Sequence, residues 1–377
     1  MAYRVVQWST GGVGTQALRA LVRSGDFELV GVYTHREDRV GRDAGDIAAL
    51  GIETGVRATS DVDALLALRP ACVVYTATGE TRPKQAVAEI ELILGSGANV
   101  VSSSMMNLVY PPAAYPRTVE TLAAACAQGC STLFTSGIDP GFSGDALPLA
   151  ALQICARVDV IRVQELADYG THPDAAWAVP YGFGQPEGAP APLLEPGVPT
   201  LFWGGMVAML ADMLGAELEG REEFCERWYA PETFDVALGH IEKGTLAAVR
   251  FGVAGIVGGA PRLIAEHVTR TRPDMAPHWP TPPAGTRSVH RVDIEGSPSL
   301  TLDLHLGGSE PGGAAGGGLL ATAMRLVNAV PAVVAAPPGL VTPLDLRLGT
   351  GRNLLAPEAT WPGTAAPAAR GPQRGRT

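Results

Sequence analysis

The sequence predicts an α/β protein with two domains: an N-terminal Rossmann domain with a parallel sheet, and a second α+β domain with an antiparallel sheet. The first observation is the glycine-rich stretch 9–14, which follows an apolar strand and opens a helix. The second is the alternation of strand-like and helix-like segments up to about residue 140. The third is a series of alternating strands with short turns between residues 234 and 305, which favours antiparallel pairing because parallel neighbours need long crossovers.

The first domain, residues 1–140, has the β-α-β period of a parallel sheet. The predicted strands cover residues 3–8, 28–34, 71–79, 99–104 and 130–137, and the predicted helices cover 12–24, 61–70, 84–97 and 119–129. Ligands bind at the carboxyl ends of the strands in open sheets of this kind. Here those ends are residues 9–10, 33–36, 76–79 and 102–105.

The second domain is predicted over residues 141–316. Its helices are expected over about 143–155 and over 201–215, and its strands over 158–169, 234–241, 246–257, 262–271, 288–296 and 300–307. A glycine-rich linker precedes residues 317–350, which are expected to supply a helix, most clearly 319–330, and a strand that pack back on the Rossmann domain. Residues 351–377 have too little apolar patterning to fold and are expected to form a disordered tail.

Composition restricts the class of partner. Of the 377 residues, 46% are hydrophobic and 18% charged, as in ordinary soluble proteins with a large core. A net charge of −10 argues against nucleic acid, which needs clustered Lys and Arg, and favours a small-molecule partner. No apolar run approaches the roughly 20 residues that span a bilayer, so we expect no membrane association and a cytoplasmic location. The five cysteines lack zinc-type spacing, so no metal is expected.

The stretch QWSTGGVGTQ has the form of a dinucleotide phosphate loop in which Ser9 replaces the first glycine of G-x-G-x-x-G. Gly11 and Gly14 keep the positions that let the backbone approach a pyrophosphate and the helix pack closely on the strand. Ser9 fits the tight turn if its φ is negative, and the helix N-terminus then faces the anion. The predicted cofactor-binding residues are Ser9, Thr10, Gly11, Gly12, Val13 and Gly14, with Thr76, Ala77, Thr78, Ser102 and Ser103 at later strand ends.

The end of the second strand indicates which nicotinamide cofactor is bound. His35 and Arg36 stand where an NAD site usually has an acidic residue for the ribose 2′-hydroxyl, and Arg39 follows. Because arginine neutralises the 2′-phosphate of NADP, NADP is favoured. Glu37 and Asp38 lie between the two arginines, so NAD stays possible.

Several segments together resemble a known family: QWSTGGVGTQALRAL, GVYTHREDRVGRDAGD, NVVSSSMMNLVYPP, SGIDPGFSGDALPLA and LLATAMRLVNAVPAVVAAPPGLVTPLDL. They are similar to the dihydrodipicolinate reductase-like group that includes 2,4-diaminopentanoate dehydrogenase and the native amine dehydrogenases, over nearly the whole chain to about residue 350. The resemblance implies a Rossmann domain and a substrate domain whose antiparallel sheet also makes a homodimer. It also implies hydride transfer between NAD(P)H and an imine or amine carbon.

Two departures from the family pattern affect the expected chemistry. Dihydrodipicolinate reductases carry paired histidines and a lysine after the strand matching QELADYGTHPDA, where this chain has only His172. The amine dehydrogenases carry a glutamate in the segment matching SSSMMNLVYPP, where this chain has Met106 and Asn107 and no carboxylate from 101 to 111. Iminium formation needs an acid/base such as a partly desolvated glutamate. Either another residue serves, or the reaction is simpler, such as reduction of a preformed imine, a ketone or an activated double bond.

Candidates for this role follow the first strand of the second domain. The predicted catalytic residues are Asp168, Tyr169 and His172, with Asn107 as an orienting group. An apolar substrate pocket is expected from Met105, Met106, Asn107, Trp177, Tyr181, Phe183, Phe202 and Trp203, although core packing explains an aromatic stripe equally well.

Two functions are compatible with these observations. The first is an NAD(P)-dependent oxidoreductase that acts on a small, mostly apolar carbonyl, imine or amine, and that is amine dehydrogenase-like without the family glutamate. The alternative is an NADP-binding sensor or regulatory protein without turnover.

Overall fold

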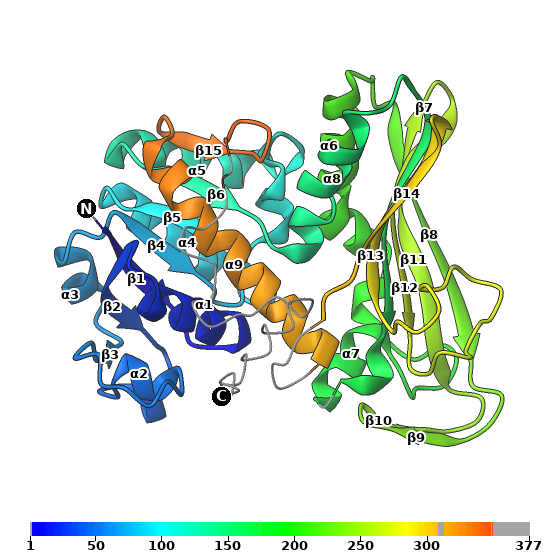
Figure 1. Cartoon of the computed structure of the whole chain (residues 1–377), viewed down its shortest axis with the longest axis horizontal. Coiled ribbons are helices and arrows are strands. Elements are labelled where there is room, and N and C mark those ends of the chain that lie inside the picture. The colour runs from blue at the N-terminus through cyan, green and yellow to red at the C-terminus, as the bar shows by residue number, and fades with distance from the viewer. Residues whose placement is uncertain (1, 173, 308–312, 348, 350–377) are drawn as a thin grey trace, which may run out of the picture.

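The computed structural model describes residues 2–172, 174–307, 313–347 and 349, and the tail predicted to be disordered, 351–377, lies outside them. Two sheets form the framework of the molecule (Figure 1). A parallel sheet with helices on both faces makes one half, and a second sheet with helices on its inner side makes the other. The predicted fold class is therefore confirmed.

The parallel sheet contains seven strands in the order β15-β6-β5-β4-β1-β2-β3. These are β1 (Tyr3–Trp8), β2 (Phe27–Tyr33), β3 (Ala58–Thr59), β4 (Cys72–Tyr75), β5 (Asn99–Ser102), β6 (Thr132–Thr135) and β15 (Gly339–Val341). All neighbouring strands run parallel. β4 and β6 are buried at every residue because helices cover both faces of the sheet.

Helices from distant parts of the chain cover this sheet. They are α1 (Gly12–Arg23), α2 (Ala44–Ile47), α3 (Val62–Ala67), α4 (Pro83–Gly95), α5 (Pro116–Gly129) and α9 (Gly313–Ala335). α1 and α9 pack together on one face, and α4 and α5 pack together on the other. β15 extends the sheet beside β6, so the C-terminal helix and strand lie on the N-terminal domain.

α9 is longer than the predicted helix 319–330 and contains Pro331. By length and composition its residues 317–335 could cross a membrane, so the expectation that no apolar run approaches this length is wrong. In the structure, however, Leu326 and Val330 are fully buried against the parallel sheet. The buried side of α9 therefore belongs to the core of this domain.

The second sheet contains six strands in the order β14-β13-β7-β12-β11-β8. These are β7 (Arg157–Asp168), β8 (Gly220–Tyr229), β11 (Leu246–Val257), β12 (Ala260–Arg270), β13 (Val289–Ser297) and β14 (Leu300–Leu304). The sheet is mixed, because β7 and β12 run parallel while the other neighbours are antiparallel. β8 was not among the predicted strands, since its sequence GREEFCERWY lies at the sheet edge and is mostly exposed.

The helices of the second half are α6 (Ala146–Leu152), α7 (Ala178–Tyr181) and α8 (Val198–Leu214), and a small hairpin is formed by β9 (Phe234–Val236) and β10 (Gly239–Ile241). α8 packs on β11 and β12 through Met206 and Leu210, and on the segment after β5 through Met209. It is apolar on nearly all sides because it lies between the two sheets.

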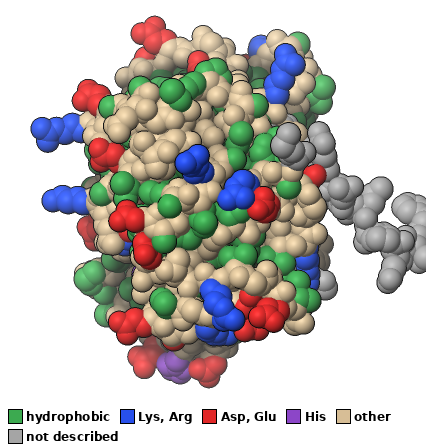
Figure 2. Space-filling view, turned by 90° about the vertical axis from the view of Figure 1, so that its left-hand side faces the viewer, with side chains coloured by type: hydrophobic (Ala, Val, Ile, Leu, Met, Phe, Trp, Pro, Cys, Tyr) green, Lys and Arg blue, Asp and Glu red, His purple; other side chains and the backbone are tan. Residues whose placement is uncertain are grey.

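The surface of the parallel-sheet domain carries charges of both signs. Figure 2 shows one face of this domain, on which basic and acidic side chains are interspersed and hydrophobic side chains are scattered. Polyanion binding needs a continuous basic patch. This face does not offer one.

Candidate active site

A cavity of about 740 Å³ lies between the two halves of the molecule. The parallel-sheet half contributes the start of α1, the loops after β4, β5 and β6, and the first turns of α9. The other half contributes β7, β12, β13 and the loop-rich segment 169–203. The cavity thus brings the carboxyl edge of the parallel sheet, where ligands bind in such folds, against a wall from the second domain.

Three ionisable side chains form a row across neighbouring strands in this wall. Glu165 on β7 is in register with His267 on β12 and with His290 on β13. Residues in register on adjacent strands lie about 5 Å apart and point to the same face. All three side chains line the cavity, so the row faces the parallel-sheet domain.

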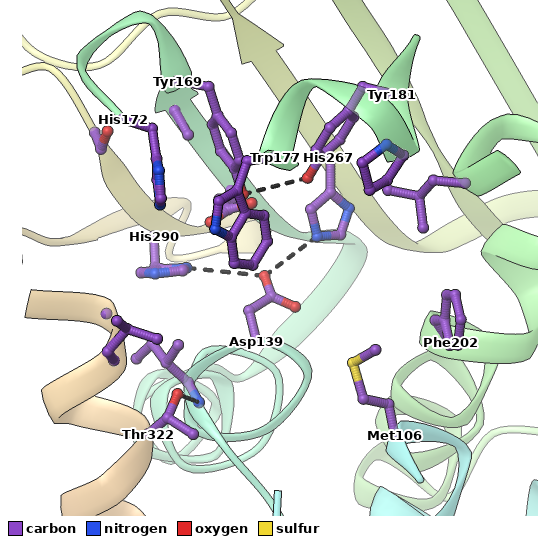
Figure 3. Close-up of a pocket in the computed structure, with 18 of the residues that line it drawn as sticks. Met106, Asp139, Tyr169, His172, Trp177, Tyr181, Phe202, His267, His290 and Thr322 are labelled. Atoms are coloured by element: carbon purple, nitrogen blue, oxygen red, sulfur yellow. Dashed lines mark hydrogen bonds and ion pairs between the residues drawn. The ribbon is translucent and has the colours of Figure 1, made fainter. Parts of the chain in front are cut away.

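Asp139 meets this row from the other domain. It lies in the loop Ile138–Phe142 after β6 and points at the two histidines (Figure 3). Its Oδ2 lies 3.4 Å from His267 Nε2 and 3.8 Å from His290 Nδ1. Its Oδ1 accepts a 2.9 Å hydrogen bond from Trp203 Nε1 on α8. The carboxylate therefore links both domains at the cavity.

The protonation states of the row follow from burial and from these partners. Burial raises the pKa of Asp139, but His267, His290 and Trp203 together outweigh it and leave the pKa below its usual value. Burial lowers the pKa of His267, but Asp139, with smaller contributions from Glu165 and Glu266, outweighs it and leaves the pKa raised. Burial also raises the pKa of Glu165, and His290 and His267 offset this only in part. An aspartate–imidazolium pair therefore lies beside a carboxyl group that holds its proton to higher pH than an ordinary glutamate.

Aromatic side chains form the rest of this wall (Figure 3). The Tyr181 hydroxyl donates a 3.2 Å hydrogen bond to the Tyr169 hydroxyl, and the two rings meet edge to face at 5.2 Å. Trp177 lies 5.2 Å from His172 between ring centroids, at the more exposed end of the cavity. Burial raises the pKa of both tyrosines, so both remain proton donors. The cavity therefore combines an apolar surface with a few hydroxyl and acid groups, as expected of a small-molecule site.

The phosphate loop has the geometry of a dinucleotide site. Gly11 is the N-cap of α1 and supplies no side-chain hydrogen bond, and a Cβ atom added there would meet no described atom within 4 Å. A Cβ at Gly14 would lie 2.4 Å from the Ser9 carbonyl oxygen and 2.6 Å from Thr76 Oγ1. The helix start is thus open to a pyrophosphate, while the turn behind it is closed to any side chain.

One expectation for this loop is wrong. Ser9 has a φ of 76°, not the negative value that we expected for a serine at this position. The tight turn keeps the left-handed backbone that glycine normally supplies, and Ser9 adopts it with its Cβ atom. Gln7 Nε2 donates to the Ser9 carbonyl oxygen at 2.9 Å and so supports the turn from behind.

The two arginines after β2 are arranged differently from each other. Arg36 makes a two-point contact with Asp38, with Nε to Oδ1 at 3.0 Å and Nη2 to Oδ2 at 2.8 Å, on the exposed surface. The Arg39 guanidinium instead donates to the Thr10 carbonyl oxygen of the phosphate loop. His35 is exposed beside them. Arg39 is thus joined to the loop, and Arg36 shares its charge with an acid.

Comparisons with known proteins agree with this arrangement. A model of the 2,4-diaminopentanoate dehydrogenase C-terminal domain matches residues 201–354. An amine dehydrogenase from Streptomyces virginiae is 41% identical over 346 residues, which cover 91% of this chain and 96% of that protein. The chain belongs to the amine dehydrogenase family. It is accordingly an NAD(P)-dependent oxidoreductase, as the resemblance implied.

Two more distant proteins also match nearly the whole length of this chain. A 2,4-diaminopentanoate dehydrogenase from Acetoanaerobium sticklandii is 23% identical over 381 residues, covering 94% of this chain and 98% of that protein. The solved structure of an amine dehydrogenase from Mycobacterium smegmatis has a TM-score of 0.73 at 21% identity, covering 93% of this chain and 98% of that one. The whole two-domain fold is therefore shared.

Of the four predicted catalytic residues, three line the cavity: Asp168, Tyr169 and His172. Asp168 is engaged in holding the end of β7, because its Oδ1 accepts from Gly170 N at 3.0 Å and its Oδ2 lies 3.0 Å from Arg287 Nε. Burial lowers the pKa of His172, so its imidazole is neutral near pH 7. The fourth, Asn107, lies outside the cavity wall, and its side-chain nitrogen is buried.

The predicted pocket and cofactor residues also divide into two groups. Met106, Trp177, Tyr181, Phe202 and Trp203 line the cavity, as do Val13, Thr78 and Ser103 from the predicted cofactor set. Met105 and Phe183 instead pack in the cores of the two domains. Thr76 and Ser102 serve the loops, since Thr76 Oγ1 donates to the Trp8 carbonyl oxygen and Ser102 Oγ accepts from Ser104 N, both at 2.9 Å.

The sequence prediction missed the ionisable residues of the row and Asp139. Glu165 lies between Val163 and Ala167 on the inward face of β7. The sequence did offer one indication of Glu165: an acidic residue at an inward position of an alternating strand. Burying an acidic side chain costs free energy, so such a position indicates a functional role. Within the described part of the chain, no three His, Cys, Asp or Glu side chains are grouped as a metal site.

Proposed function

We propose that this protein transfers hydride between a nicotinamide cofactor and a small, mostly apolar carbonyl, imine or amine. The observation that carries the proposal is the shared cavity, which is lined by Val13 at the start of α1, by the Glu165–His267 row and by an aromatic wall. When bound, the cofactor supplies or accepts the hydride. The residues of the cavity hold the substrate, exclude water and handle its protons.

The charge of the cavity favours a substrate without a carboxylate. Its wall includes the acids Glu80, Asp139, Glu165 and Asp168, and the described residues that line it include no lysine or arginine. The nearby cations, the His267 imidazolium and the Arg287 guanidinium, are already paired with Asp139 and Asp168. A substrate carboxylate would therefore be buried beside these acids without a free cationic partner, which costs several kcal/mol. An amine or iminium cation is stabilised in the same place. The substrate class is therefore distinct from an amino acid such as 2,4-diaminopentanoate.

A matched pair of carbonyl compounds tests this proposal. With ammonium and NADPH or NADH, 4-phenyl-2-butanone should be aminated with a kcat/KM at least about a hundredfold above that of 2-oxo-4-phenylbutanoate, since an unpaired buried charge costs about 3 kcal/mol or more. The variant Phe202→Arg adds a cation to the wall and should reduce the difference in kcat/KM between the two compounds. Equal use of both compounds would contradict the substrate class. Tight NADPH binding with no turnover on a broad panel would favour the alternative, an NADP-binding sensor.

We also propose a preference for NADP over NAD, supported by Arg36 and Arg39 after β2. Arg36→Ala should weaken NADPH binding about tenfold to a hundredfold and leave NADH binding nearly unchanged, because only NADPH has a 2′-phosphate to pair with the guanidinium. Titration calorimetry with both cofactors measures this. Arg57→Ala is the control, since Arg57 is exposed and pairs with Glu53. Equal losses for both cofactors would refute the assignment.

A cytoplasmic homodimer remains our proposal for the assembly and location. It is supported by the composition and by the resemblance, which implies a dimer through the second sheet. Light scattering of the purified protein measures the oligomeric state, and a monomer would contradict it.

A further inference from the structure

We propose that Glu165 is the general acid/base for carbon–nitrogen bond formation and cleavage in this cavity. It would do the work for which the chain has no carboxylate between residues 101 and 111. The inference rests on the proposed function, because only a carbonyl, imine or amine substrate needs this step. It is reached by comparing the four carboxylates of the cavity.

Glu80 is the carboxylate nearest to the segment in which the family glutamate is expected. Its Oε1 accepts from Met105 N at 3.0 Å and from Met106 N at 3.3 Å, and its Oε2 accepts from Gly79 N at 3.1 Å. These three hydrogen bonds occupy both oxygens of the carboxylate and fix the side chain. Glu80 therefore holds the turn after β5, and its oxygens are already engaged by the backbone.

Two further carboxylates are committed to charged partners. Asp168 is bonded to Gly170 N and paired with Arg287. Asp139 is the counter-ion of His267, and that pairing keeps it ionised. A carboxylate that is held ionised is a weak acid/base near neutral pH.

Glu165 differs from these three because it has no hydrogen bond or ion pair with any described residue. It lies on the cavity wall with its oxygens free to meet a substrate. Burial raises its pKa toward the range in which a carboxyl group both gives and takes protons. The titratable groups that face it are His267 from β12, His290 from β13, Asp139 from the loop after β6, and Tyr169 and Tyr181.

Glu165 gives up one proton and regains one in each cycle of the proposed step. Protonated Glu165 gives its proton to the hydroxyl of the carbinolamine formed from ketone and ammonia. The carbon–oxygen bond breaks, water leaves with its electron pair, and the nitrogen lone pair forms the carbon–nitrogen double bond of the iminium ion. Ionised Glu165 then takes a proton from an incoming ammonium ion, which releases ammonia and restores the acid. The nearby ion pair of Asp139 and His267 adds no net charge that would oppose the iminium ion.

A substrate that bypasses the step separates this role from a structural one. Glu165→Gln should lower ammonia-dependent amination of 4-phenyl-2-butanone by about 10²–10⁴-fold. Reduction of a preformed cyclic iminium such as protonated 2-methyl-1-pyrroline needs no proton from the protein and should change less than about fivefold. At a fixed concentration of free ammonia, wild-type amination should fall as pH rises through the pKa of Glu165, because the acid form is lost. In Glu165→Gln, amination should not show this decrease with rising pH.

Matched variants complete the experiment. Glu295→Gln makes the same change at an exposed position of β13 and should behave as wild type. If Glu165→Gln aminates like wild type, or loses amination and cyclic iminium reduction equally, the assignment is overturned. If Glu80→Gln loses amination and Glu165→Gln does not, the acid/base role belongs to Glu80. A wild type that reduces ketones or preformed imines but shows no ammonia-dependent turnover would overturn the assignment alone. A wild type that transfers hydride to none of these substrates would instead contradict the proposed function.

Infrared difference spectroscopy of the cofactor-free protein tests Glu165 independently of turnover. A protonated carboxyl band should disappear over a pH range above that of an ordinary glutamate, and the band should be missing in Glu165→Gln. A spectrum unchanged by the substitution would overturn the assignment.

Discussion

Replacing Gly14 by valine is expected to abolish nicotinamide cofactor binding. Even the first atom of the new side chain would lie 2.4 Å from the Ser9 carbonyl oxygen and 2.6 Å from Thr76 Oγ1. These are not free groups, because the Ser9 carbonyl accepts from Gln7 Nε2 and Thr76 Oγ1 donates to the Trp8 carbonyl. The turn must therefore shift, and with it the N–H groups at the start of α1 that would hold the pyrophosphate.

Fluorescence titration with NADPH and NADH measures the loss, and two other glycines serve as matched controls. Gly25→Ala lies beyond the end of α1, where a Cβ meets no described atom within 4 Å, and should leave both binding and stability unchanged. Gly11→Ala has the same free space but faces the proposed pyrophosphate position, so it should fold normally and bind more weakly. A soluble Gly14→Val protein with unchanged affinity would mean that the loop is only a turn.

The parallel-sheet domain was readily predictable because its signals are local. β4 and β6 are covered on both faces, so each is a short apolar run bounded by small residues. The second sheet is less predictable. β8 is charged and mostly exposed at the edge, and the parallel pairing of β7 with β12 depends on which strands meet in space. The periodicity of apolar residues indicates neither which strand lies at a sheet edge nor which strands pair.

The candidate site was only partly predictable for the same reason. Glu165, His267 and His290 are far apart in the sequence and become neighbours only through the register of three strands. Asp139 was visible in the motif SGIDPGFSGD, but its direction depends on the loop after β6 and on the packing of Trp203. The φ of Ser9 was mispredicted because the intrinsic preference of serine yielded to the geometry of the tight turn.

A second large effect is expected from Arg325→Met, which should reduce the free energy of unfolding by about 3–5 kcal/mol. Arg325 on α9 places Nη2 2.7 Å from Asp145 Oδ1 and donates from Nε to Ser136 Oγ at 3.2 Å. The Asp145 side chain is fully buried, and it also caps the start of α6 by accepting from Ala146 N. Removing the guanidinium leaves an unpaired carboxylate in the core between α9, β6 and α6.

The pH dependence and two control variants identify this mechanism. The pKa of Asp145 is already raised by burial, which Arg325 offsets in part, and it should rise further in Arg325→Met. A carboxyl whose pKa is higher in the folded than in the unfolded state favours folding as the pH falls, so the loss of unfolding free energy in the variant should become smaller in acid.

Asp145→Asn/Arg325→Met should recover part of the loss at neutral pH, because no buried charge remains. Arg157→Met removes an exposed pair with Asp159 and should cost less than about 1 kcal/mol. Urea unfolding of these variants at two pH values measures the differences, and a loss of stability in Arg325→Met that is independent of pH would show that packing, not the unpaired charge, is responsible.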